Sequence, residues 1–135
     1  MQNWYNASGK PLSSASWLTA HHRAKLPERL LFAHSFLKFR PKRIVDLGCG
    51  PGLWLDLLND IAPSNCEFIG IDSDSVLLDE ARIRSARWDR QKQFINLDIE
   101  NHGAELPNSE MFLAFNFFPY LRQPTIALDA IKQKL

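Results

Sequence analysis

The sequence predicts an α/β fold built on a doubly wound parallel sheet with helices on both faces. Four short segments that are mostly apolar follow one another between residues 43 and 115. Helical patterns separate them, and apolar strands that alternate with helices are typical of a parallel sheet buried on both faces. A glycine-rich turn joins the first segment to the helix after it. These observations predict one α/β domain with a helical segment before it.

Length and composition are those of one ordinary folded domain. The chain has 135 residues, of which 45% are apolar and 23% are charged. A chain of this length can bury a core without a metal or a disulfide, and its apolar fraction excludes a wholly disordered protein. No apolar run approaches the roughly 18 residues that a membrane span requires. The N-terminus also lacks the pattern of a secretory signal.

The two cysteines, Cys49 and Cys66, provide no disulfide framework. One follows the end of a predicted strand, and the other precedes the start of its parallel neighbour, so they are expected at opposite ends of the sheet. That separation, on the order of 15 Å at ~3.3 Å per residue, exceeds the ~7 Å limit between the Cα atoms of a disulfide. Free thiols and the absence of a signal favour a reducing, cytoplasmic location.

Residues 1–41 are expected to form a polar leader followed by basic helices. Residues 1–16 are rich in serine, which indicates a loose leader. Residues 17–39 carry apolar side chains at helical spacing. Because proline is tolerated in the first turn of a helix but not in its middle, Pro27 is expected to divide this stretch into a short piece and a longer helix.

Residues 42–135 alternate between strand and helix. Ser75 is expected to cap the second helix of this region, which carries acids in its first turns. Because crossovers between parallel strands are right-handed, the strand order is predicted as 3-2-1-4. The predicted strands are residues 43–47, 68–72, 94–98 and 111–115, and the predicted helices are residues 53–62, 76–88 and 125–135.

Charge is distributed unevenly along the chain. The first 43 residues hold eight basic residues and one acid, Glu28, for a net charge of +7, whereas the remaining 92 residues carry −6. One interpretation is a solvated basic helix packed on an acidic body. The other is a surface that attracts an anionic substrate, such as RNA or a phosphorylated small molecule. The adjacent His21 and His22 would point about 100° apart on a helix, so no metal site is predicted.

The glycine-rich turn, residues 46–52 with the sequence DLGCGPG, carries the strongest chemical signal. Its glycines, Gly48, Gly50 and Gly52, allow a tight turn and let a ligand approach the backbone. A dinucleotide fingerprint, G-x-G-x-x-G, would need a third glycine where this chain has Leu53, so the spacing disfavours NAD and FAD. Asp46, before the first glycine, suits a ligand with a positive group better than it suits a pyrophosphate.

This turn resembles motif I of the class I, Rossmann-like S-adenosylmethionine-dependent methyltransferases, which is written acid-x-Gly-x-Gly-x-Gly. The resemblance implies S-adenosylmethionine as cofactor, with Asp46 orienting its amino-acid end. It implies that Asp72, which ends the second strand 24 residues after Gly48, accepts hydrogen bonds from both ribose hydroxyls. It also implies that Asp98 accepts from the adenine amino group and that the N–H of Ile99 reaches a ring nitrogen.

The resemblance extends the candidate site to residues around these positions. The turn backbone from Gly48 to Gly52, including Cys49, resembles the part that touches the methionine and ribose, and Asn116 and Phe117 would line the methionine end. Ser73 departs from the family, in which an apolar residue packs on the adenine ring. Structural alternatives remain open: packing for Gly52, helix capping for Asp72 and Asp74, an ordinary strand end for Asp98, and a turn for Asn116.

The resemblance covers roughly residues 42–135, which are expected to form an incomplete S-adenosylmethionine-binding domain. The family's sheet usually has seven strands in the order 3-2-1-4-5-7-6, and this chain is predicted to lack strands 5–7. Residues 111–115 would then form an exposed apolar sheet edge, which natural proteins rarely leave bare. Three explanations are open: pairing with a second copy or a partner chain, a gene fragment, or coverage of the edge by the last helix.

The function implied is S-adenosylmethionine-dependent methyl transfer, with a small-molecule acceptor favoured and RNA as the alternative partner. No catalytic base is identifiable. Residues 116–120, with the sequence NFFPY, are not of the Asn-Pro-Pro-Tyr type, which argues against adenine-N6 methylation. Two rival hypotheses are a domain that binds the cofactor without transfer and an inactive fragment that needs a partner chain.

Overall fold

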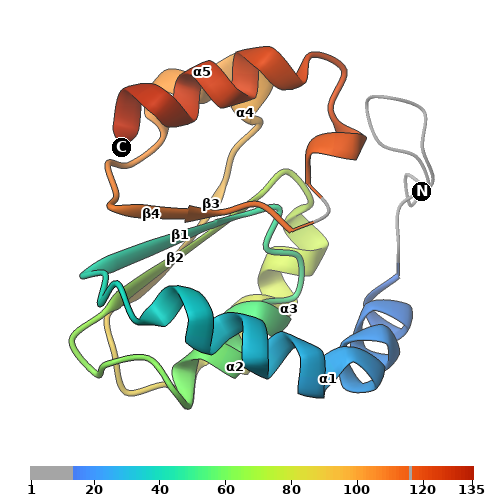
Figure 1. The fold of residues 1–135 in the computed structure, drawn as a ribbon. Coiled ribbons are helices and arrows are strands. Elements are labelled where there is room, and N and C mark those ends of the chain that lie inside the picture. Colours follow the sequence, from blue (N-terminus) through green and yellow to red (C-terminus); the bar gives the residue numbers. More distant parts are fainter. Residues whose placement is uncertain (1–13, 116) are drawn as a thin grey trace.

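The computed structural model describes residues 14–115 and 117–135, and its centre is a parallel sheet. The four strands lie in the order β3-β2-β1-β4, which confirms the predicted topology. Helices cover both faces of the sheet (Figure 1). In chain order the elements are α1 (Ala15–Leu37), β1 (Arg43–Leu47), α2 (Leu53–Asn59), β2 (Glu67–Asp72), α3 (Ser75–Ser85), β3 (Lys92–Asn96), α4 (Ile99–His102), η1 (Gly103–Glu105), β4 (Met111–Leu113), η2 (Phe118–Tyr120) and α5 (Pro124–Lys134).

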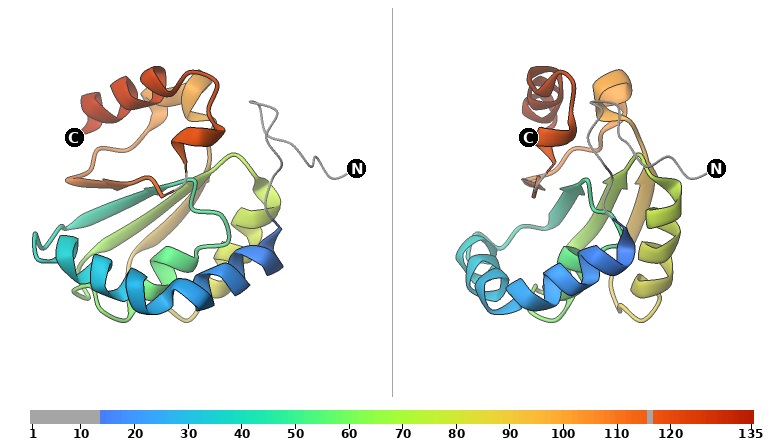
Figure 2. Two further views of the ribbon diagram at one scale, coloured as in Figure 1. Left: turned by 45° about the vertical axis from the view of Figure 1, so that its right-hand side comes forward. Right: turned by 90° about the vertical axis from the view of Figure 1, so that its right-hand side faces the viewer.

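The helices form two groups on opposite faces of the sheet. Figure 2 shows α1, α2 and α3 on one face and α4 and α5 on the other. Because successive residues of a strand point to opposite faces, Asp46 shares the α1 side of the sheet with Ile44. The core beneath α1 and α2 includes Ala33, Ile44, Leu55 and Phe68, and the core beneath α5 includes Val45, Ile71, Ala127 and Ile131.

The N-terminal helix is continuous, so the predicted division at Pro27 is wrong. Residues Ala15–Leu37 form one helix with Pro27 inside it. Pro27 has no N–H to donate to the carbonyl of Arg23, but the helix loses only that bond. Ala33 and Leu37 are buried in the core beneath α1, and this packing stabilises the part of the helix that follows Pro27.

The third strand begins and ends two residues before its predicted position. β3 spans Lys92–Asn96, and Asp98 lies beyond it. The side chain of Asp98 accepts a hydrogen bond from the backbone N–H of Glu100 at 3.0 Å and so caps the short helix α4. This local capping bond ends the extended conformation before the apolar pattern of the sequence ends.

The cap of α3 is Asp74, so the prediction of Ser75 as its cap is also wrong. Asp74 Oδ1 accepts from the backbone N–H groups of Val76 at 3.0 Å and Leu77 at 3.3 Å. The cap one residue earlier lets Ser75 join the first turn of the helix. Three further elements end earlier than predicted: α2 at Asn59, α3 at Ser85 and β4 at Leu113.

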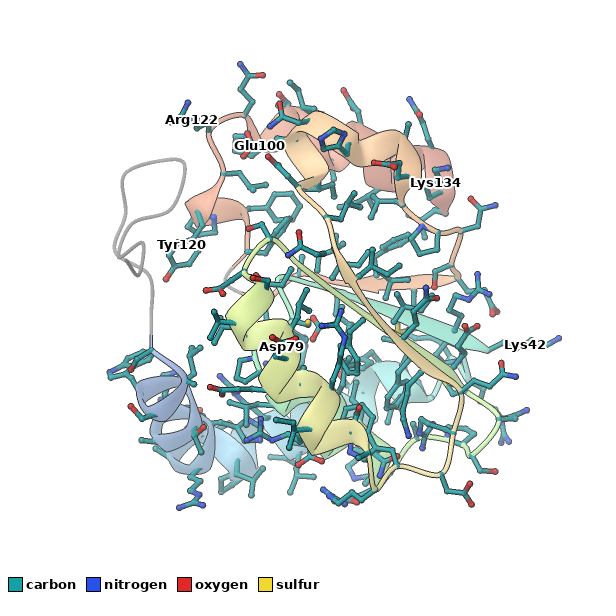
Figure 3. All side chains as sticks on the ribbon, turned by 180° about the vertical axis from the view of Figure 1, so that it is seen from behind. Lys42, Asp79, Glu100, Tyr120, Arg122 and Lys134 are labelled. Atoms are coloured by element: carbon teal, nitrogen blue, oxygen red, sulfur yellow. The ribbon has the colours of Figure 1, made fainter. Side chains whose placement is uncertain are left out.

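The second face of the sheet is closed by α4 and α5. Glu100 of α4 caps the start of α5, because its carboxylate accepts from the backbone N–H groups of Arg122 at 3.2 Å and Gln123 at 2.8 Å. Figure 3 shows Glu100 and Arg122 side by side. α5 packs over this face, and β4 has one neighbouring strand, β1, within the part of the chain that is described.

A single arginine, Arg90, ties the end of α2 to the start of β2. Its guanidinium stacks on the Phe68 ring, with Cζ 4.2 Å from the ring centroid. Five hydrogen bonds of 2.9–3.3 Å run from the same group to one loop, with Asn59 Oδ1 and the carbonyl oxygens of Asn59, Ala62, Pro63 and Cys66 as acceptors. Only the planar five-donor fork of arginine can satisfy these acceptors together.

The variant Arg90→Met is therefore expected to lower the free energy of unfolding by about 2–4 kcal/mol, because several partly buried carbonyl groups lose their donor. Denaturant titration monitored by circular dichroism measures this. The matched control is Arg23→Met on the exposed side of α1, which is expected to change the value by less than about 0.5 kcal/mol. Equal effects of the two substitutions would contradict this role for Arg90.

Candidate functional site

The glycine-rich turn lies at the carboxyl ends of β1 and β2. The backbone N–H groups of Gly48 and Cys49 both donate to the carbonyl of Ile71, at 2.8 and 3.0 Å, so the turn curls over the end of β2. Gly48 has φ 68° and is exposed, and a Cβ added to it would lie 2.8 Å from Cδ2 of Phe117. A side chain at this position would therefore be strained and would collide with the residue that follows β4.

Asp72 is fixed directly to this turn. Its Oδ2 accepts from the backbone N–H of Gly50 at 2.8 Å, and its Oδ1 accepts from that of Asp74 at 2.8 Å. A carboxylate offers about four acceptor positions, so these bonds do not use all of its acceptor capacity. Burial raises the pKa of Asp72, and the backbone N–H groups of Asp74, Gly50 and Ser73 oppose that shift. The cap of α3 is Asp74, so the alternative that Asp72 caps this helix is wrong.

Asp46 is a carboxyl group buried beneath the turn, with 2% of its surface exposed. Its pKa is raised to about 8, mainly by burial and also by the nearby Asp72, while the positive charge of Arg29 partly opposes the shift. Asp46 is therefore mostly protonated at pH 7, and a cation placed beside it would favour its charged form.

Arg29 of α1 is a further candidate site residue, which the sequence did not reveal. Its Nη1 lies 2.7 Å from Nδ1 of His22, and its Cζ lies 5.0 Å from the ring centroid of Trp54. Trp54 in turn stacks on Phe115, just after β4, with centroids 4.0 Å apart. Arg29 is one of eight basic residues among the first 43. The sequence does not distinguish it from the solvated ones, because its inward position depends on the packing of α1 on α2.

Three residues predicted near the adenine end occupy different environments. Both oxygens of Asp98 have partners within the chain, the N–H of Glu100 at 3.0 Å and Nδ2 of Asn101 at 2.6 Å, and Ile99 is buried. Ser73 is exposed between Asp72 and the cap of α3. A contact of these residues with adenine stays a prediction.

The remaining predicted residues are Cys49 and Gly52 of the turn and Asn116, which follows β4 in the sequence. The thiol of Cys49 is buried and its pKa is raised well above the usual value by burial, so only its backbone faces the turn. A Cβ on Gly52 would lie 3.2 Å from Cβ of Ala81, so this glycine allows α2 and α3 to pack closely. Asn116 lies outside the described residues.

Other candidate sites are few among residues 14–115 and 117–135. No group of three metal-ligating side chains is found there, and no helix is long and apolar enough to cross a membrane. Both cysteines are free, as expected. An open hollow of about 520 Å³ lies at the opposite end of the strands, beside Lys42 and Lys134 (Figure 3), and it does not touch the glycine-rich turn.

A four-stranded 3-2-1-4 sheet, a glycine-rich turn after β1 and a carboxylate at the end of β2 define a Rossmann-like domain of the class I S-adenosylmethionine-dependent methyltransferase type. The chain belongs to the family described as "Methyltransferase domain", whose family model matches residues 44–135. The predicted fold and family are thus confirmed, and S-adenosylmethionine is the cofactor of this family.

Two curated relatives match a little over half of the chain. Malonyl-(acyl-carrier protein) O-methyltransferase of Legionella pneumophila is 32% identical over 76 residues, which is 56% of this chain and 26% of the relative. Trans-aconitate 2-methyltransferase of Rhodopseudomonas palustris is 33% identical over 81 residues, which is 60% of this chain and 29% of the relative. The matched part therefore spans less than a third of either protein.

Solved structures share the fold at low sequence identity. The plantazolicin methyltransferase BamL, in complex with a triazolic desmethylPZN analog and SAH, has a TM-score of 0.65 and 20% identity, covering 82% of this chain and 41% of its own. The N-terminal domain of EvdMO1 with SAH bound has a TM-score of 0.68 and 17% identity, covering 78% of this chain and 45% of its own.

Proposed function

We propose that this chain binds S-adenosylmethionine at the glycine-rich turn and acts as the cofactor-binding part of a methyltransferase. The observation that carries the proposal is the Asp72 carboxylate, which the backbone N–H groups of Gly50 and Asp74 hold at the carboxyl end of the sheet with acceptor positions to spare. Ligands of open α/β sheets bind at this end, where neighbouring strands connect in opposite directions.

The ribose end of the cofactor fits Asp72 and the turn. Two adjacent hydroxyl groups of a ribose can donate to one carboxylate that keeps acceptor capacity free. Gly48 is exposed, so a ligand can reach its backbone. A side chain at this position would collide with Phe117, so only glycine fits there. We assign Gly48, Cys49 and Gly50 to backbone contact with the cofactor.

The amino-acid end of the cofactor fits Asp46 and Arg29. It carries an ammonium group and a carboxylate, and the site offers a buried carboxyl group together with a guanidinium whose charge acts on it. The ammonium would restore the charge of Asp46, and the carboxylate would pair with Arg29. Each charged group of the amino-acid end would thus meet a residue of opposite charge, which fixes the orientation of that end in the site.

When bound, the cofactor supplies an electrophilic methyl group on its sulfonium. The contribution of the chain is to hold that group still and oriented toward an acceptor. The stacked rings of Trp54 and Phe115 contact Phe32 of α1 and would form one wall of the reaction site. No residue is assigned as a catalytic base.

A small molecule is the proposed acceptor. The names of the curated relatives refer to trans-aconitate and to a malonyl group, which are both carboxylic acids. The basic residues of α1 would attract an anionic acceptor of this kind. RNA as a partner and a second chain paired along β4 stay alternative predictions. A cytoplasmic location is also proposed, since both cysteines are free thiols.

Calorimetric titration with S-adenosylhomocysteine (SAH), which keeps the ribose and amino-acid ends, tests the proposal. Because the ligand must meet a charged Asp46, whose pKa is about 8 in the free chain, binding is expected to weaken about tenfold per pH unit as pH falls from 8 to 6.5. In two buffers of different ionisation enthalpy, roughly one proton should be released per ligand at pH 7.

The outcomes separate the candidate functions. Absence of binding at millimolar SAH would contradict both the methyltransferase and the binding-only hypothesis. Binding of S-adenosylmethionine without methyl transfer to carboxylic acid acceptors would favour the domain that binds without transfer or needs a partner chain. Methyl transfer would establish the enzyme.

A further inference from the structure

His22 is a buried histidine on α1 that makes a specific contact with Arg29. It is 9% exposed, and its Nδ1 lies 2.7 Å from Nη1 of Arg29. A guanidinium has five donors and no acceptor, so Nδ1 must accept this hydrogen bond. The ring is therefore neutral, with its proton on Nε2.

We infer that His22 is a positioning residue, which accepts a hydrogen bond from Arg29 and so holds its guanidinium toward the amino-acid end of the cofactor. The inference rests on the proposed function, in which Arg29 pairs with the carboxylate of that end. It adds a residue that makes no contact with the cofactor itself but decides where its partner points.

The geometry gives Arg29 two anchors. Residues 22 and 29 are seven positions apart, which is two helical turns, so both side chains leave the same face of α1. The guanidinium edge is held by His22, and its face lies over Trp54 with Cζ 5.0 Å from the ring centroid. Trp54 is itself stacked on Phe115. An edge contact and a face contact together fix the plane of the guanidinium, whereas Trp54 alone would let it rotate.

The surroundings of His22 keep the ring neutral. Burial lowers its pKa most, and Arg29 and His21 of α1 and Arg84 of α3 lower it further, while Asp56 of α2 opposes them. Protonation would place a further positive charge beside Arg29 and Arg84 and turn Nδ1 from an acceptor into a donor. Once the pH is low enough to protonate it, His22 should therefore release Arg29, and cofactor affinity should fall more steeply than the titration of Asp46 alone would cause.

Three variants test the inference through SAH affinity measured by calorimetry at pH 8, 6.5 and 5.5. His22→Leu removes the acceptor, and binding at pH 8 is expected to weaken about tenfold. His22→Asn keeps an acceptor, because its Oδ1 lies as many bonds from the backbone as Nδ1 does, and affinity at pH 8 is expected to stay within about threefold of the parent. Asparagine does not titrate, so the additional loss at pH 5.5 should disappear.

His34→Asn, exposed on the same helix, is the matched control and should match the parent at every pH.

A double-variant cycle shows whether the effect passes through Arg29. In an Arg29→Leu background, His22→Leu is expected to cause no further loss of affinity, since the two residues act as one unit. If the leucine variants fail to fold, the comparison of His22→Asn with the parent at pH 5.5 and 8 carries the test.

The failures of the two proposals differ. If the parent chain does not bind SAH, the proposed function itself is wrong. If the parent binds SAH but His22→Asn keeps the full pH profile, or His22→Leu weakens binding equally with and without Arg29, the positioning role is overturned.

Discussion

Replacing Asp72 with alanine is expected to weaken binding of SAH at least about a hundredfold. Two hydrogen bonds to a charged acceptor are lost, each contributing on the order of 1.5–3 kcal/mol, and every 1.4 kcal/mol is a factor of ten in affinity. The glycine-rich turn also loses a tether, because Gly50 N–H donates to this carboxylate at 2.8 Å. Calorimetric titration at pH 8 measures the change.

Asp79→Ala is the matched control for this prediction. Asp79 lies on α3 (Figure 3), where it is exposed and pairs with Arg82 at 2.9 Å, so its loss removes the same charge without touching the turn. Its affinity for SAH should equal that of the parent. Asp72→Asn separates shape from charge: it retains one acceptor oxygen and should fall between the parent and Asp72→Ala. An affinity of Asp72→Ala within threefold of the parent would refute the site.

The parts of this site that follow from neighbouring residues were predictable. The residues of β1, the turn after it and Asp72 at the end of β2 each rest on a short pattern: an apolar run, glycines at alternate positions and an acid at a strand end. Hydrogen bonds between adjacent strands then bring Gly50 and Asp72 together. The parallel pairing of β1 with β2 follows from the alternation of apolar strands with helices. The prediction of this pairing therefore needed no knowledge of contacts between distant residues.

The parts that were missed depend on competition between interactions. Asp98 follows a run of apolar residues, which predicts the end of a strand. In the structure its carboxylate accepts from the N–H of Glu100 instead and caps a helix. Pro27 reads as a break, but the packing of Ala33 and Leu37 outweighs one lost bond. Local propensity predicts neither outcome. Each depends on how a local preference compares in strength with a contact that forms only in the folded chain.

Arg29 and His22 were missed for a different reason. In the sequence, Arg29 is one basic residue of a helix with several, and His22 is one of an adjacent pair. Their positions become informative only when α1 packs beside α2 and brings them to Trp54. The basic segment was expected to be either solvated or attractive to an anion, and Arg29 shows that part of it turns inward, toward the charge of Asp46.

Replacing Asp46 with asparagine is expected to stabilise the chain and weaken cofactor binding at the same time. The pKa of Asp46 rises from 3.8 to about 8 on folding because the carboxyl is buried. The Asp46 carboxyl therefore binds its proton more tightly in the folded state than in the unfolded state. Its contribution to the free energy of unfolding is fully present below about pH 4 and is lost as the pH rises toward 8. Asparagine is nearly the same size and never ionises, so it avoids that loss without leaving a cavity.

The difference in unfolding free energy between Asp46→Asn and the parent should accordingly grow by about 1.4 kcal/mol per pH unit from pH 4 to pH 8 and then level off. Denaturant titrations at pH 5, 6.5 and 8 measure this slope. Asp60→Asn, an exposed acid at the end of α2, is the control and should show no comparable slope.

The same substitution should lower SAH affinity at pH 8 by at least about tenfold, because a neutral amide cannot pair with the ammonium group. Affinity should also become nearly constant between pH 6.5 and 8, since the group that releases the proton is gone. A stable variant with unchanged affinity would mean that Asp46 only shapes the turn. A variant whose stability parallels the parent at every pH would mean that the carboxyl is not buried in its neutral form. The expected pair of results, higher stability and weaker binding, would show that the chain retains a destabilising acid beneath its turn because the cofactor's ammonium group requires it.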